Sequence, residues 1–90
     1  MWFEWDESKR LTNLDKHGID FLRAKEIWSD DVLEVPSPRD DHGERRHLAY
    51  GRLDGRVVAV VFTWRGKSRR IISARRARSY EREIYEDTFG

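Results

Sequence analysis

The sequence predicts an α+β fold in which a small antiparallel sheet is flanked by helices, in the order β-α-α-β-β-β-β-α. Apolar residues keep helical spacing to about residue 28, form strand-like runs from residue 31, and regain helical spacing from Ala77. Asp54-Gly55, between two apolar runs, is a strong signal for a two-residue hairpin turn. Helices grouped at both ends of an antiparallel meander favour one domain over residues 1–90, with the helices on one sheet face and the other face free for function.

The first helix is bounded by a start signal and a stop signal. Trp2–Trp5 alternates too briefly for more than an edge strand. Asp6 is a good N-cap, because its carboxylate can accept the first free backbone N–H groups of a helix. Gly18 suits a left-handed C-cap. These residues predict a helix from about Glu7 to Lys16.

A second short helix and then a strand follow. Asp20 can cap a helix over about Phe21–Trp28, whose apolar residues form one stripe. Val32–Val35 is typical of a strand, and the two prolines that follow predict its end. Ser37–Glu44 is polar and acidic, so we expect it to be a loop.

The second half of the chain predicts three strands and a helix. Arg45–Leu53 and Arg56–Trp64 flank the hairpin turn, and the second of them is apolar at both alternating positions, which is typical of a central strand buried on both faces. A turn at Arg65–Ser68 leads to a strand at Arg69–Ala74. The last helix carries Ala77, Tyr80 and Ile84 on one side and is expected to end near Glu86.

Charge is divided between the two halves of the chain. Residues 1–44 hold 6 Lys and Arg against 12 Asp and Glu, whereas residues 45–90 hold 12 against 5. From Arg45 to Arg78 there are 11 basic residues and one acid, Asp54. A rigid basic face on the predicted sheet would suit a phosphate-rich partner such as nucleic acid. The alternative is a solvated surface whose arginines pair with the acidic half.

Several classes of protein and site are excluded or disfavoured. The chain has no cysteine, which excludes disulfides and thiolate metal sites. No apolar run approaches the ~18 residues of a membrane span, and the N-terminus lacks a signal-peptide pattern, so we expect a soluble cytoplasmic protein. Asp40, Asp41, His42 and His47 do not form a recognised metal-ligand pattern, and no glycine-rich phosphate loop occurs. We therefore expect no cofactor.

Arginine dominates the basic set, and its planar guanidinium suits phosphate oxygens. Tyr50, Trp64 and Tyr80 lie among these arginines and could stack on unpaired bases or simply pack in the core. Lys16-His17 at the end of the first helix could transfer protons or merely cap the helix. RNA cleavage needs only such groups, because the ribose 2′-hydroxyl attacks its own phosphate and the protein supplies a base, an acid and positive charge.

Specific motifs run through nearly the whole chain in order. They are Phe3-Glu4-Trp5-Asp6, Lys9, Asn13, Lys16-His17-Gly18-Ile19, Phe21, Ala24, Gly51-Arg52, Phe62-Thr63, Arg65, Arg70-Ile71-Ile72-Ser73-Ala74-Arg75-Arg76-Ala77, Glu81 and Tyr85. In this combination the chain resembles the BrnT toxin family. The resemblance implies a type II toxin–antitoxin ribonuclease with a RelE-like fold that inhibits translation. It also implies a ribbon-helix-helix antitoxin of the BrnA type, which binds promoter DNA and forms a 2:2 assembly with the toxin.

The resemblance also directs the choice of site residues. The expected catalytic residues are Lys16, His17, Arg52, Arg65, Arg75 and Glu81, and the expected RNA-binding residues are Arg69, Arg70, Arg76 and Tyr50. Glu81 could act as a base or as the partner that orients an arginine. Arg78 stands where family members often have a threonine that caps the last helix, so the cap is either unfilled or passes to Ser79.

A second function fits the same charges. The chain could be a non-catalytic module whose basic sheet binds nucleic acid or an acidic partner. Lys16-His17 favours the enzyme, because a simple binding module has no need of a titratable group there.

Overall fold

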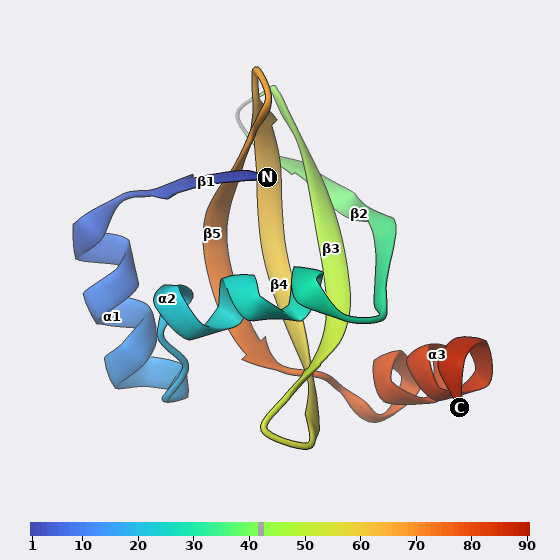
Figure 1. Ribbon diagram of the computed structural model, residues 1–90. Helices are drawn as coiled ribbons and strands as arrows, with labels where there is room; N and C mark the ends of the chain where they lie inside the picture. Colours follow the sequence, from blue (N-terminus) through green and yellow to red (C-terminus); the bar gives the residue numbers. More distant parts are fainter. Residues whose placement is uncertain (42) are drawn as a thin grey trace.

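The computed structural model describes residues 1–41 and 43–90, with side chains described at all of these except residues 38–41. The elements in chain order are β1 (Trp2–Trp5), α1 (Glu7–His17), α2 (Phe21–Ala24), the 3-10 helix η1 (Lys25–Ser29), β2 (Val32–Asp41), β3 (Glu44–Leu53), β4 (Arg56–Arg65), β5 (Ser68–Arg76) and α3 (Ser79–Phe89) (Figure 1). This confirms the α+β class and the predicted order, with η1 added.

The strands form one mixed sheet in the order β1-β5-β4-β3-β2. The four strands of the meander pair antiparallel, but β1 pairs parallel with β5, from Trp2 opposite Ser68 to Trp5 opposite Ile71. The expectation of a purely antiparallel sheet was therefore wrong. Two helical segments separate β1 from the meander, so β1 can reach the far edge of the sheet and run beside β5.

The centre of the sheet follows the sequence prediction closely. β4 is the middle strand, and its residues Val57–Val60 are buried on both faces. The β3–β4 turn has positive φ at both central residues, 53° at Asp54 and 79° at Gly55, which matches the twist of a two-residue hairpin. The β4–β5 turn is shorter than predicted, because the two strands end at Arg65 and begin at Ser68.

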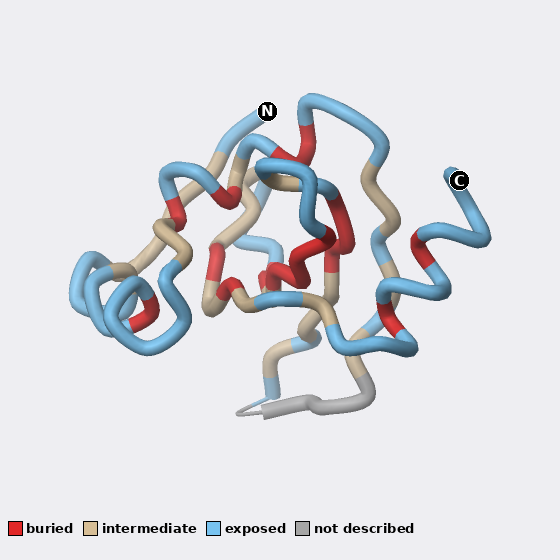
Figure 2. Tube along the Cα trace, turned by 90° about the horizontal axis from the view of Figure 1, so that it is seen from below, coloured by how far each residue is buried: buried red, intermediate tan, exposed pale blue. Residues whose placement is uncertain are grey.

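Helices cover both faces of the sheet, which corrects the expectation that one face would be free. On one face α2 and η1 cross in front of the central strands (Figure 1), and Phe21 and Ile27 join a buried cluster with Phe62 and other sheet residues. On the other face Tyr85 of α3 packs with Tyr50, Val57 and Ala59. A strand that is apolar at every position needs a cover on each side. Figure 2 shows the buried residues between these layers, with α1 and α3 on opposite flanks.

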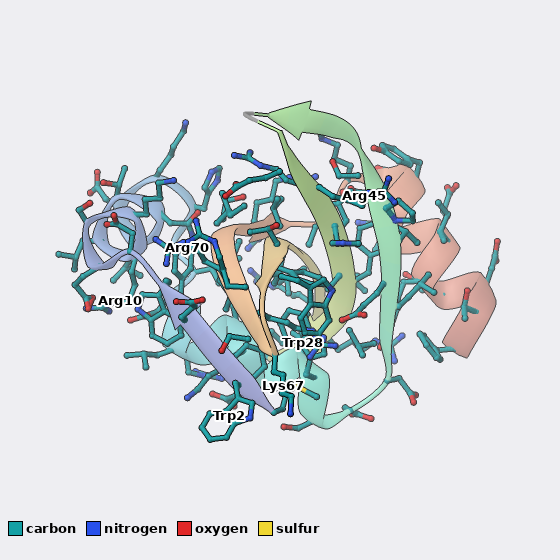
Figure 3. All side chains as sticks on the ribbon, turned by 90° about the horizontal axis from the view of Figure 1, so that it is seen from above. Trp2, Arg10, Trp28, Arg45, Lys67 and Arg70 are labelled. Carbon is teal, nitrogen blue, oxygen red and sulfur yellow. The ribbon has the colours of Figure 1, made fainter. Side chains whose placement is uncertain are left out.

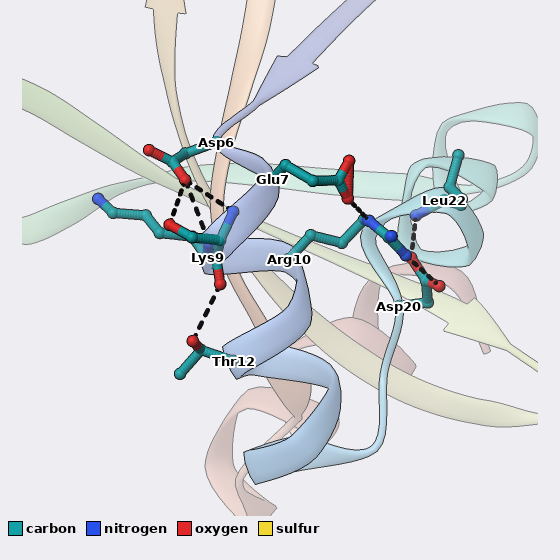
Figure 4. Close-up of polar contacts among 8 residues, drawn as sticks. Asp6, Glu7, Lys9, Arg10, Thr12, Asp20 and Leu22 are labelled. Atoms are coloured by element: carbon teal, nitrogen blue, oxygen red, sulfur yellow. Dashed lines mark hydrogen bonds and ion pairs between the residues drawn. The ribbon is translucent and has the colours of Figure 1, made fainter.

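The predicted helix caps are confirmed around α1. The carboxylate of Asp6 accepts the backbone N–H groups of Ser8 and Lys9, at 2.9 and 3.3 Å. Gly18 ends the helix at φ 71°, and its N–H donates to Leu14. Asp20 accepts the N–H of Leu22 at 2.9 Å, and Arg10 links it to α1 through ion pairs with both Asp20 and Glu7 (Figure 4).

The segment after Asp20 is helical as predicted, but its second half tightens into η1. This turn brings Ile27 directly over Gly51 of β3, where a Cβ atom would lie 2.6 Å from the Cβ of Ile27. Only glycine leaves room for so close a contact. Near the end of η1, Trp28 donates its indole N–H to Glu34 of β2 at 2.7 Å.

Two boundaries differ from those predicted. β2 continues past Pro36 to Asp41, with a register shift between Pro36 and Asp40, so the predicted loop at Ser37–Glu44 is largely strand. Proline is tolerated there because β2 is an edge strand, where an N–H facing solvent is not needed. α3 extends beyond Glu86 to Phe89, whose ring packs 5.0 Å from that of Tyr85.

Asn13 closes the part of the β5 edge that β1 does not reach. Its side-chain oxygen accepts the N–H of Ala74 at 3.1 Å, and its amide nitrogen donates to the carbonyls of Ala74 and Ile19, both at 2.9 Å. Asn13 is 6% exposed, so water cannot replace these bonds. One side chain of α1 thus imitates a neighbouring strand and fixes the helix against the sheet.

We expect Asn13→Leu to destabilise the protein by about 3 kcal/mol, because buried backbone groups of Ala74 lose their partners while the volume stays similar. Thr12→Ala on the exposed side of α1 is the control and should change the free energy of unfolding by less than about 0.5 kcal/mol. Urea denaturation of both variants measures the difference. Equal stability of the Asn13→Leu variant and the parent would contradict the edge-closing role.

Candidate functional site

The arginines of the second half do not form one basic face. Arg69 lies on the sheet face covered by η1, and Arg75 lies on the face covered by α3. Simple alternation would place the two on the same side, because they are six residues apart. The register shift in the β4–β5 pairing between Val61 and Phe62 reverses the alternation, so they lie on opposite sides. Figure 3 shows Arg45, Lys67 and Arg70 far apart on the molecule. The expectation of a single basic face was therefore wrong.

Three of the predicted site arginines pair with carboxylates from the acidic half of the chain. These are the pairs Arg65–Glu44 (3.2 Å), Arg69–Glu34 (2.9 Å) and Arg70–Glu4 (3.5 Å). The alternative interpretation of the divided charge thus describes part of the surface correctly. The pairs link β4 to β3, β5 to β2 and β5 to β1, respectively.

Arg69 is the most enclosed of the three. Its guanidinium carbon lies 4.4 Å from the ring centroid of Trp64, 5.2 Å from that of Trp28 and 5.6 Å from that of Phe62. The side chain is only 13% exposed. Stacking on these rings and the ion pair with Glu34 together stabilise the positive charge of the guanidinium. This position suits packing rather than contact with RNA.

A groove on the other face holds a different cluster. It has a volume of about 260 Å³ and lies between β2–β5 and the start of α3. We call it the α3 groove, lined by Ser37, Arg46, Leu48, Val61, Ser73, Arg75, Arg78, Tyr80 and Glu81. Of the predicted site residues, Arg75 and Glu81 line it. The sequence interpretation did not select Ser73, although Ser73 is two residues from Arg75 on the same strand and so shares its face.

Glu81 is the buried centre of this groove, with a side chain that is fully inaccessible. Arg75 donates two bonds to its carboxylate, at 2.7 and 3.1 Å. The backbone N–H of Arg78 donates at 2.8 Å and the hydroxyl of Tyr50 at 3.2 Å. The bond from Arg78 also caps α3, whose N-cap position has no side-chain acceptor. The side chain of Arg78 itself makes no cap bond, which is one of the two outcomes predicted from the sequence.

These bonds set the protonation of the cluster. Burial alone would raise the pKa of Glu81, but its bonds to Arg75 and Arg78 outweigh burial and lower the pKa below its ordinary value. The bond to Glu81 raises the pKa of Arg75. Burial, reinforced by the charge of Glu81, raises the pKa of Tyr50 to about 12. Near neutral pH the cluster is a carboxylate, a guanidinium and a neutral phenol.

The geometry therefore distinguishes two roles left open for Glu81. A carboxylate that accepts four bonds is poorly placed to take a proton from a substrate, whereas its bidentate pair fixes the plane of the Arg75 guanidinium. Tyr50 is 3% exposed, so its ring has no face open for a base. Tyr80, which also lines the groove, is 54% exposed and does have one.

Lys16 and His17 lie in a second hollow, of about 240 Å³, between α1 and β5. Ser73 is the one residue common to the linings of this hollow and of the α3 groove. Both side chains are exposed in the last turn of α1. The structure thus places the predicted proton-transfer pair beside the Arg75 cluster rather than inside it.

A third hollow, of about 390 Å³, lies where the β3–β4 hairpin meets α3. We call it the hairpin-end hollow, lined by Arg52, Gly55, Arg56, Val57, Arg76, Ala77, Arg82 and Glu86. Arg52 and Arg76 of the predicted site belong here and not to the α3 groove. Arg52 is held over the ring of Tyr85, 5.4 Å from its centroid, and donates to the carbonyl of Gly90 at 2.8 Å.

Among the described side chains, which are those of residues 1–37 and 43–90, no group of three or more His, Asp or Glu is placed to hold a metal ion. The side chains of Asp40 and Asp41, and the whole of His42, lie outside the described residues. His47 stacks on Phe62 with ring centroids 5.3 Å apart. No helix of the described part of the chain combines the length and apolar character needed to cross a bilayer.

Comparison with known proteins connects this geometry to a family. A family model described as ribonuclease toxin, BrnT, of type II toxin–antitoxin system matches residues 5–81. That range includes α1, the sheet except residues 2–4 of β1, and the first turn of α3 with Glu81. No curated protein matches the chain.

Proposed function

The chain belongs to the BrnT family of ribonuclease toxins from type II toxin–antitoxin systems, and from this membership we propose that it cleaves RNA in the α3 groove without a metal ion. The observation that supports this choice of site most directly is the bidentate Arg75–Glu81 pair. It holds a guanidinium in one orientation at the wall of a groove that Arg46, Ser73 and Arg78 also line. A fixed cation placed where charge develops needs no reorganisation during the reaction.

The proposed reaction is transfer of the phosphate within the RNA. The ribose 2′-hydroxyl loses its proton and attacks the adjacent phosphorus, the bond to the 5′-oxygen breaks, and that oxygen gains a proton. The products are a 2′,3′-cyclic phosphate and a 5′-hydroxyl. Arg75 would stabilise the charge of the phosphorane, since guanidinium donors match phosphate oxygens.

Lys16 and His17 are the proposed proton-transfer groups. The hollow that holds them shares Ser73 with the lining of the α3 groove, and both side chains carry nitrogens that can take part in proton transfer. Of the three aromatic residues that the sequence offered for base stacking, Tyr80 is the one proposed here, because it lines the groove and its ring is exposed. Arg65, Arg69 and Arg70 are proposed to stabilise the sheet through their ion pairs.

Membership in a toxin–antitoxin family implies an antitoxin partner. We expect a BrnA-type ribbon-helix-helix protein in a 2:2 assembly that covers the α3 groove, because covering the site is a direct way to neutralise the enzyme. A RelE-like fold and a cytoplasmic location are further expectations from the family resemblance.

A non-catalytic module that binds nucleic acid through the same groove is the alternative. Both functions need the cations, but only the enzyme needs an attacking 2′-hydroxyl. The test is incubation of the purified chain with single-stranded RNA in EDTA, and separately with Mg²⁺. We expect equal cleavage rates, a cyclic phosphate at the new 3′ end, and no cleavage where the attacking ribose is 2′-deoxy.

Two results would contradict the proposal in different ways. RNA that stays intact in both buffers, although it binds, would favour the non-catalytic module. Cleavage that occurs only with Mg²⁺ would retain the ribonuclease but overturn the metal-independent mechanism.

A further inference from the structure

The hairpin-end hollow has an excess of positive charge, and none of its arginines lines the α3 groove. Four guanidinium groups line it, from Arg52, Arg56, Arg76 and Arg82, and Glu86 is the one carboxylate among its lining residues. Glu86 pairs with Arg82 at 3.7 Å. Three more cations than anions therefore face one small space. Like charges gathered in this way destabilise a protein unless an anion occupies the space between them.

Two of these arginines have no anionic partner. In the part of the chain that the structure describes, Arg56 and Arg76 have no carboxylate within 4 Å, and both are exposed. Asp54, the acid nearest in sequence to Arg56, points its carboxylate to Arg23 of α2 at 2.8 Å. Asp20 and Asp54 line a neighbouring hollow together with Arg56 and Arg76, but their carboxylates pair with Arg10 and Arg23.

Part of the hollow is fixed by contacts within the protein. Arg52 is fixed by its stacking over Tyr85 and its bond to the carbonyl of Gly90. Arg56 begins β4 directly after the Asp54-Gly55 turn, and Arg76 at the end of β5 pairs with Val58 of β4. Arg52 is thus ordered before an anion binds, which lowers the entropy cost of binding.

The position of the hollow relative to the α3 groove indicates a path. Arg75 and Arg76 are adjacent in β5, yet Arg75 lines the groove and Arg76 lines the hollow. The start of α3 separates the two, with Tyr80 and Glu81 on the groove side and Arg82 on the hollow side. A strand of RNA that leaves the groove over the β5–α3 connection would reach the hollow next.

We propose that the hairpin-end hollow is a second phosphate-binding site, which holds the backbone of the RNA strand outside the cleaved nucleotides. This rests on the proposed ribonuclease function for its ligand, but it is a separate claim about binding. It assigns Arg52 and Arg76 to holding the strand, and it adds Arg56 and Arg82, which sequence interpretation did not select. The contacts are to phosphate, so they carry no base preference.

The test compares binding of a short and a long RNA. The probes are fluorescent 2′-O-methyl oligonucleotides of about 4 and about 12 nucleotides, within the range that small single-strand binding domains cover. They cannot be cleaved, because no free 2′-hydroxyl is present. The variant is Arg56→Gln/Arg76→Gln, and the matched control is Arg45→Gln/Lys67→Gln. The control removes the same two charges at the opposite end of the sheet.

We expect the wild type to bind the long probe more tightly than the short one. The Arg56→Gln/Arg76→Gln variant should lose roughly tenfold in affinity for the long probe and much less for the short one. Its plot of log affinity against log salt should become shallower by about 1.4, since each phosphate contact on a single strand contributes about 0.7. The control should keep the wild-type difference between the two probes.

An equal loss for both probes, or the same loss in the control, would overturn the second site. If the double variant does not fold, the same binding measurement is made on Arg56→Gln alone, for which we expect half the change in salt slope. Failure of the ribonuclease proposal is recognised separately, by intact cleavable RNA in EDTA. The length dependence of binding stays measurable in that case.

Discussion

Replacing Arg75 with alanine should lower the rate of RNA cleavage by about 100- to 1,000-fold, the usual effect of removing one donor that stabilises charge in a transition state. The guanidinium is the groove's best-oriented cation, because Glu81 holds it by two bonds. Arg75→Lys keeps the charge but cannot form the bidentate pair, so we expect it to recover only a small part of the rate. Cleavage of a labelled oligonucleotide at saturating concentration measures both variants.

The loss must be separated from a loss of folding, since Arg75→Ala also leaves a buried carboxylate without its partner. The double variant Arg75→Ala/Glu81→Gln removes both charges and should regain much of the stability while staying inactive. Arg23→Ala is the matched control, because Arg23 also pairs with carboxylates but lies on α2 at the opposite face. Activity in the double variant would exclude Arg75 from catalysis.

The elements that the sequence predicted well are those whose signals are local. Asp6, Gly18 and Asp20 each act within four residues of their own position, and each cap is found as predicted. Asp54-Gly55 likewise sets its turn by its own backbone preferences. Such signals depend little on the rest of the fold.

The features that were missed depend on residues far apart in the chain. The parallel pairing of β1 with β5 joins residues more than 60 positions apart, and nothing in Trp2–Trp5 specifies the partner. The length of β2 depends on its being an edge, where Pro36 costs no hydrogen bond. Both are facts of sheet order, which sequence periodicity does not encode.

The same reason explains the mistaken parts of the site. Alternation along β3 shows that Tyr50 and Arg52 share a face, but it does not show that α3 covers that face. Once α3 is placed there, Tyr50 is buried against Glu81 and Arg52 lies over Tyr85. Arg75 and Glu81 were both predicted as site residues. The chain turns from β5 into α3 between them, and this turn brings the two charges together.

Glu81→Gln should destabilise the protein by about 3 kcal/mol, because it leaves Arg75 partly buried without a counter-charge. For a domain of this size that corresponds to a fall in Tm of roughly 15 °C. Glu83→Gln is the control, since Glu83 is exposed on the same helix and forms no ion pair within the described residues. Thermal unfolding at neutral pH measures both.

The pH dependence of this difference tests its cause. The folded-state pKa of Glu81 lies below its ordinary value, so the protein gains stability from the ionised carboxylate above the unfolded pKa of about 4.3. That stability is lost as the pH falls through the lower folded-state pKa. The gap in unfolding free energy between the parent and Glu81→Gln should therefore be full at pH 7 and shrink progressively below about pH 4.3. A gap that stays constant down to acid pH would show that Glu81 acts through its shape rather than its charge, and the fixed orientation of Arg75 would then need another source.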